Sequence, residues 1–188
     1  MNAPQYSSLF LLSGFLLLIL YSCGKETKKE TKTETNQVEK SVKTSLNNTT
    51  QKSTVVFADV KINELYAHYL EVKKHLVNGD VKAVKKAAKH FETFLSKHQF
   101  ETSFEATANL IALTRNLQKQ RDFFKTLTTE TEAVLKSATI TSGELYTQFC
   151  PMAFEGKGGY WLSDSKEIRN PYYGEKMLKC GNIKEIIQ

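Results

Sequence analysis

A sharp change of composition divides this chain and limits how much of it can fold. Residues 1–22 carry no charged side chain, whereas residues 24–53 carry seven lysines and four glutamates and almost no large apolar residue. A segment with so little apolar surface cannot offset the entropy lost on ordering. We therefore expect a disordered polar tether over residues 23–53. Roughly 135 residues, from Thr54 to Gln188, then remain to build one domain.

The N-terminal segment has the pattern of a lipoprotein signal peptide. The apolar run Leu9–Leu20 is shorter than the about 20 residues that cross a bilayer, and it has the length of a signal-peptide core. Leu20-Tyr21-Ser22-Cys23 follows and resembles the lipobox of bacterial lipoproteins. The resemblance implies that residues 1–22 are removed and that Cys23 is lipidated. It places the protein in the bacterial envelope, facing the periplasm or the surface; a simple signal peptide or a weak anchor is the alternative.

Apolar periodicity predicts that residues 54–140 are helical. Large apolar residues recur at intervals of three and four from Ile62 onwards. Asn78-Gly79-Asp80 can end one helix and cap the next. The stretch 103–137 lacks Gly and Pro, and it forms either one long helix or two with a break near 118–121. We therefore predict a mostly α fold, an antiparallel bundle of three or four helices.

Several function classes find no support in the sequence. Half of the net charge of +6 lies in the polar tract 24–53, and the other half is spread over the rest of the chain. A phosphate-binding surface needs clustered cations, so we expect no nucleic-acid binding. No catalytic motif for thiol exchange, phosphate binding or hydrolysis is recognisable, so we expect no enzyme. His68 and His75 would lie about 10 Å apart along a helix, too far to share one metal ion without other ligands. We expect these histidines, with His90 and His98, to be superficial or half-buried.

The C-terminal residues 141–188 differ from the rest in their glycines, turn formers and aromatic side chains. We predict an irregular, hairpin-like cap that belongs to the same domain. Its four sulfur-bearing residues are Cys150, Met152, Met177 and Cys180. If the chain folds back between them, two thiols and two thioethers converge, and such soft donors select Cu(I) or Ag(I) over hard ions. Trp161 is a candidate shield for that site.

Two other states of the cysteines stay open at this point. In an oxidising compartment Cys150 and Cys180 form a disulfide readily, and closing that loop stabilises a fold by roughly 3–4 kcal/mol on the chain-entropy model. The two methionines would then fill gaps in the core, with Trp161 as the main apolar anchor. Free buried thiols are the third possibility. The sequence does not decide among a metal site, a disulfide and free thiols.

Four short motifs in this C-terminal segment carry a family resemblance. They are Cys150–Ala153, Tyr160–Asp164, Ile168–Gly174 and Met177–Gly181. Together they resemble a functionally uncharacterised periplasmic domain family, common in Bacteroidetes-type bacteria. That family occurs alone on lipoproteins and fused to the periplasmic adaptor subunits of copper and silver efflux pumps. The resemblance covers most of residues 62–187 and implies a role in heavy-metal handling or efflux. The alternative is a metal-free, disulfide-stapled interaction module that docks an envelope partner such as an efflux adaptor.

Overall fold

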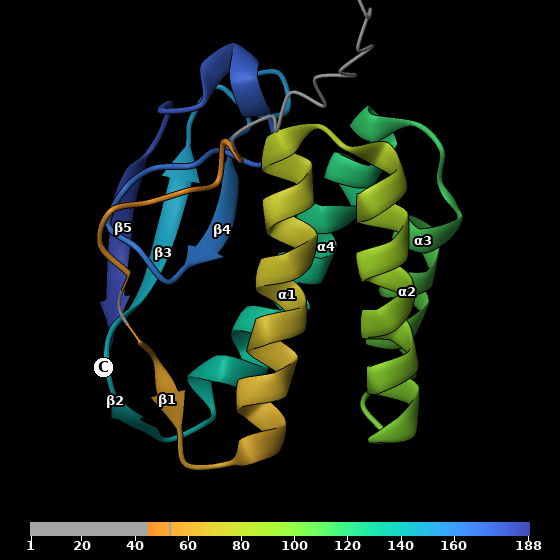
Figure 1. The fold of residues 1–188 in the computed structure, drawn as a ribbon, viewed down its shortest axis with the longest axis vertical. Coiled ribbons are helices and arrows are strands. Elements are labelled where there is room, and N and C mark those ends of the chain that lie inside the picture. Colours follow the sequence, from red (N-terminus) through yellow and green to blue (C-terminus); the bar gives the residue numbers. More distant parts are fainter. Residues whose placement is uncertain (1–44, 53) are drawn as a thin grey trace, which may run out of the picture. The chain divides into compact units, whose positions relative to one another are not determined.

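A computed structural model describes residues 45–52 and 54–188, which form four α-helices and two small antiparallel sheets (Figure 1). The helices are α1 (Val60–Asn78), α2 (Val81–Lys97), α3 (Thr102–Leu113) and α4 (Leu117–Lys136), with a short 3-10 helix η1 (Gly174–Met177). The strands are β1 (Val56–Phe57), β2 (Ile140–Ser142), β3 (Leu145–Cys150), β4 (Gly159–Ser163) and β5 (Asn182–Ile187). The fold is mostly helical, as predicted. The predicted signal peptide and Cys23 lie outside the described residues, within which no helix has the length and apolarity to cross a membrane.

Local capping interactions set the helix boundaries. Gly79 ends α1 in the left-handed conformation with a φ of 68°, and the Asp80 side chain caps α2 by accepting a backbone hydrogen bond at 3.0 Å. The predicted turn between these helices is therefore confirmed. The stretch 103–137 holds two helices, and the break falls at residues 114–116, slightly before the predicted position. Asn116 caps α4 there in the same way as Asp80 caps α2.

Each helix packs against the next one along the chain, and α1 also packs against α4. Figure 1 shows α1 and α4 between the three-stranded sheet on one side and α2 with α3 on the other. The largest fully buried side chains include Trp161, Tyr69, Phe57, Lys73, Phe91 and Phe124. All but one of these are aromatic, and they come from the helices and from the sheet. One shared core therefore holds both layers together.

The C-terminal segment, predicted as an irregular, hairpin-like cap, contains a three-stranded antiparallel sheet together with the turns and loops of residues 151–158 and 164–181. The prediction missed this sheet. The strand order is β4-β3-β5, with β3 in the centre and a hairpin loop between β3 and β4. Five of the six residues of β3 are buried, on both faces of the strand. A strand buried in this way lacks the alternation of apolar and polar residues that marks a half-exposed strand. The strand pair β1–β2 was missed as well.

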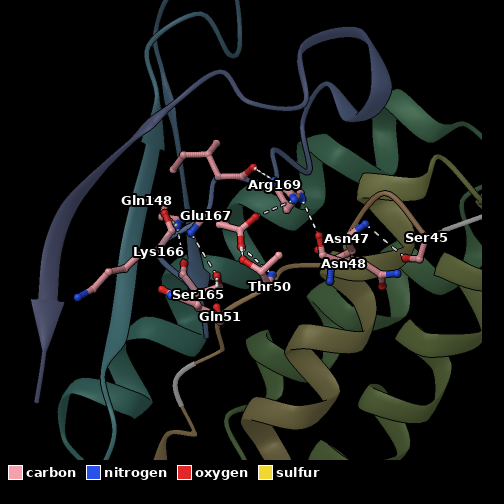
Figure 2. Close-up of polar contacts among 11 residues, drawn as sticks. Ser45, Asn47, Asn48, Thr50, Gln51, Gln148, Ser165, Lys166, Glu167 and Arg169 are labelled. Carbon is pink, nitrogen blue, oxygen red and sulfur yellow. Dashed lines mark hydrogen bonds and ion pairs between the residues drawn. The ribbon is translucent and has the colours of Figure 1, made fainter.

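Residues 45–52, which we call the strap, bind to the domain, and the prediction of a disordered tether up to residue 53 was wrong for them. Hydrogen bonds join Thr50 to Glu167, Asn48 to Arg169 and Gln51 to Ser165 (Figure 2). The hydroxyl and the amide of Thr50 each donate to one Glu167 oxygen at 2.6 Å and hold the pKa of that carboxyl below its usual value. Hydrogen bonds to loop groups, which composition does not reveal, fix this segment.

A layer of buried polar contacts lies between α1 and the sheet. The Tyr69 hydroxyl accepts a hydrogen bond from the Leu162 amide at 2.9 Å and pairs with the Thr128 hydroxyl at 3.0 Å. One turn further along α1, Lys73 is 2% exposed and its Nζ donates to Ser163 Oγ at 3.0 Å. Burial lowers the pKa of Lys73 to about 8. These bonds fix the position of β4 on the helices, because a buried polar group that loses its hydrogen-bond partner is costly.

The loop before β5 meets the C-terminal end of α1 at very short range. Arg121 of α4 bridges the two, since its Nε donates to Pro171 O at 2.9 Å and its Nη2 to Leu76 O at 3.3 Å. Gly174 has a φ of 57°, and a Cβ added there would lie 2.7 Å from Val77 O. A side chain at this position would push the loop away from α1.

We expect Gly174→Ala to lower the free energy of unfolding by about 2 kcal/mol more than Gly156→Ala does. Gly156 is a matched control because its φ is 84° and a Cβ added there meets nothing within 4 Å. Both variants carry the cost of a left-handed alanine, and only Gly174→Ala adds the collision. Urea denaturation of the two variants measures the difference. Equal destabilisation would show that the contact with α1 is not tight.

Candidate functional site

The pairing of β3 with β5 brings two cysteines together. Phe149 pairs with Asn182, so that Cys150 at the end of β3 faces the residues just before β5. The sulfur atoms of Cys150 and Cys180 lie 2.9 Å apart, and both residues are free cysteines. Cys150 is fully buried and Cys180 is half-buried. Residues 30 positions apart in the chain thus form a thiol pair that is covered on one side and open on the other.

Asn170 holds the backbone that carries Cys180. This fully buried side chain donates from Nδ2 to Cys180 O at 2.8 Å and accepts at Oδ1 from the amide of Tyr172 at 2.8 Å. The backbone amide of Asn170 also donates to Leu178 O at 2.9 Å. In the sequence, Asn170 stood out only as part of the motif Ile168–Gly174, in a stretch rich in turn formers. The asparagine's reach to a residue ten positions later was missed, and nothing in a single sequence signals it.

The environment of Cys180 favours the protonated thiol. Its hydrogen bond with Cys150, its burial and the charge of Cys150 raise its pKa to about 11, while a hydrogen bond from the Met152 amide acts in the opposite direction. A thiol with this pKa is almost fully protonated at neutral pH. Any metal ion that binds here must therefore displace the Cys180 proton.

The backbones of the two methionines lie next to the thiols, while their side chains are exposed to solvent. The Met152 amide contacts the Cys180 sulfur, and the Cys180 amide donates to Met177 O at 3.0 Å. The Met152 side chain is 54% exposed and that of Met177 is 37% exposed. The Tyr173 hydroxyl donates to Met152 O at 2.6 Å and so joins the two loops. The fold therefore brings the four predicted residues to one place, with only the two thiols in direct sulfur contact.

Trp161 lies on the buried face of the sheet beside the cysteine pair. It is fully buried, and its Nε1 donates to Gln148 Oε1 at 2.7 Å. Gln148 is two residues before Cys150, so that the side chains of Cys150 and Gln148 project to the same face of β3. A Cβ on Gly181 would lie 2.8 Å from the edge of the indole. The indole thus covers the backbone next to Cys180 from the inside of the domain.

The described residues hold no other cluster with metal-ligand chemistry. Across residues 45–52 and 54–188, no group of three or more His, Cys, Asp or Glu side chains is placed to hold a metal ion. The four histidines are half-buried or exposed, as expected, and His75 bonds to Glu71 at 2.9 Å. Structural zinc usually takes four Cys or His ligands, which this pair does not supply. Two thiols with two nearby thioethers instead form a donor set of soft sulfur.

One protein family matches part of the chain. The model of the DUF3347 family is similar to a stretch of the chain that covers less than half of its length. This family, described as a protein of unknown function, matches residues 65–143. The DUF3347 match begins within α1 and ends just after β2, so that β3 and both cysteines follow it. No curated protein and no solved structure matches the chain significantly. The prediction of an uncharacterised family is confirmed over this stretch, while the lipoprotein and efflux contexts remain predictions.

Replacing Cys150 with Ala should make Cys180 more reactive toward iodoacetamide. Loss of the Cys150 hydrogen bond, together with the loss of its charge, returns the pKa of Cys180 from about 11 toward its ordinary value. The gain in thiolate outweighs the lower nucleophilicity of a less basic sulfur, so we expect about tenfold faster alkylation at pH 8. Mass spectrometry of the Cys180 peptide separates it from Cys23. In urea, Cys180 should react at the same rate in the unchanged chain and in Cys150→Ala. Equal rates in the folded state would contradict the coupling of the thiols.

Proposed function

We propose that this chain is an envelope lipoprotein that binds Cu(I) or Ag(I) and acts in heavy-metal handling or efflux. Cys150 and Cys180 supply the thiolate ligands, and Met152 and Met177 supply thioethers. The observation that carries the proposal is the 2.9 Å contact between the two sulfur atoms, one from the end of β3 and the other from the loop just before β5. The role is binding and not catalysis.

The chemistry of the site favours a soft, monovalent ion. Calcium and magnesium take several oxygen ligands, whereas this site offers sulfur. The buried side of the pair, next to Cys150 and Trp161, excludes water on that side. Half-exposed methionines at the open side are free to turn toward a metal that arrives from solvent. Flexible thioethers that meet a fixed thiol pair suit transfer of a metal better than permanent storage.

The N-terminal sequence supports an envelope location. The pattern around Cys23 implies a lipid anchor, and residues 23–44 are the polar stretch between that anchor and the strap. The family resemblance of the C-terminal motifs suggests a heavy-metal efflux adaptor as partner. We also interpret the four helices as an antiparallel bundle. In this bundle, α1 and α4 support the sheet next to which the thiols lie.

The same sulfur contact favours a second candidate, a metal-free interaction module. An oxidising compartment converts a thiol pair this close into a disulfide, whose S–S bond is about 2.05 Å. The oxidised domain would then dock a partner through exposed aromatic side chains such as Tyr160, which is 46% exposed. Alkylation of the extracted protein without prior reduction distinguishes the metal-binding protein from the disulfide-bonded module. Alkylation of both Cys150 and Cys180 would contradict the disulfide.

A competitive Cu(I) titration of the reduced full chain tests the metal proposal. Cys23→Ser serves as the background because it removes the third thiol. In this background we expect one tightly bound Cu(I), and Cys150→Ser or Cys180→Ser should weaken binding by at least about 100-fold, since each removes a thiolate ligand. Met152→Leu and Met177→Leu preserve the side-chain volume and should each weaken binding by about tenfold. Affinity unchanged by both serine variants would rule the site out.

A further inference from the structure

The outer face of α2 carries a row of lysines. Lys82, Lys86 and Lys89 are exposed and Lys85 is partly exposed. Positions three and four apart lie on one face of a helix, so these four cations share about two turns of α2. The opposite face of α2 packs into the core through Val84, Ala88, Phe91 and Leu95. The lysine face is thus held outward by the packing of the helix.

Most of this positive charge is not neutralised. Helix α2 contains five lysines and one glutamate. Glu92 pairs with Lys89, and within the described part of the chain no carboxylate lies at ion-pair distance from Lys82, Lys85 or Lys86. Charge that is concentrated on one helix face attracts an anionic surface more strongly than the same charge spread over the domain. Composition alone did not reveal this concentration.

The first residues of the strap contact the turn that leads into α2. The Asn78 side chain accepts a hydrogen bond from the Leu46 amide at 2.7 Å and donates to Ser45 Oγ at 3.1 Å. Ser45, Asn78 and Lys82 also line one shallow pocket at the turn between α1 and α2. The chain that precedes residue 45 therefore joins the domain beside the first lysine of the row. An anchor at its far end would keep the lysine face near the membrane.

We propose that the lysine face of α2 (Lys82, Lys85, Lys86 and Lys89) rests on an anionic phospholipid surface and orients the anchored domain. The orientation rests on the lipid anchor of the proposed function, whereas the attraction between the lysines and the headgroup phosphates does not. Each lysine near an anionic leaflet adds to the binding, and its effect falls off within a Debye length. The three-stranded sheet lies on the other side of α1 and α4 (Figure 1). The thiol pair would then face away from the membrane, toward a partner or incoming metal.

Lysine acetylation on vesicles tests this orientation. The full chain is reconstituted with vesicles of phosphatidylcholine alone or with phosphatidylglycerol added, and acetylation rates are read by mass spectrometry. We expect the four lysines of the lysine face to react about fivefold more slowly on the anionic vesicles only, with the protection lost at high salt. Lys166 and Lys184, which are exposed on the sheet side, are internal controls and should react equally on both. Equal rates for the α2 lysines on both vesicles, or equal slowing of every lysine, would overturn the proposal; in the first case an acidic protein would be the better partner.

A charge-matched pair of variants separates this proposal from the anchor. Replacing Lys82, Lys85, Lys86 and Lys89 with Gln should weaken flotation with anionic vesicles at least about fivefold more than the same replacement at Lys157, Lys166, Lys179 and Lys184. Equal effects of the two sets would contradict a specific lysine face. Flotation with pure phosphatidylcholine depends on the anchor alone. A chain that does not float with these vesicles would contradict the lipoprotein proposal. The comparison between the two sets of lysine variants would still be valid.

Discussion

The antiparallel pairing of β3 with β5 sets the position of nearly every group in the candidate site. It fixes Cys150 opposite the residues just before β5, and it leaves Cys180 on a loop that Asn170 holds by its side chain. β4 pairs with the other edge of β3 and carries Trp161 to the buried face. A slip of one residue in either register would turn every side chain of that strand to the opposite face. The thiol contact is therefore a consequence of strand register.

Buried polar contacts connect this sheet to the helices and keep its register. Tyr69 and Lys73 of α1 bind groups of β4, and Arg121 of α4 binds the loop before β5. The strap adds an outer layer of hydrogen bonds to residues 165–169 (Figure 2). Such groups are costly to bury without partners, so they favour one arrangement over near alternatives. The helical part of the chain thus acts as a platform that holds the sheet.

The sequence predicted the helical half better than the sheet. Periodicity and the Asn78-Gly79-Asp80 turn are local signals, and they gave the first two helices and their connection correctly. β3 was missed because burial on both faces removes its alternation, and the docked strap was missed because polar composition looks the same whether it is ordered or not. Cys150 and Cys180 were predicted as partners from their residue type. The roles of Asn170 and Gln148 depend on contacts between distant segments, which no periodicity encodes.

We propose that strand register creates a soft-metal centre from two thiols, with thioethers at its open side. X-ray absorption at the copper edge, on the reduced chain in the Cys23→Ser background loaded with one equivalent of Cu(I), tests it most directly. We expect a first coordination shell of sulfur alone that loses sulfur scatterers in Cys150→Ser and Cys180→Ser. A shell that contains nitrogen or oxygen, or one that neither variant alters, would contradict it.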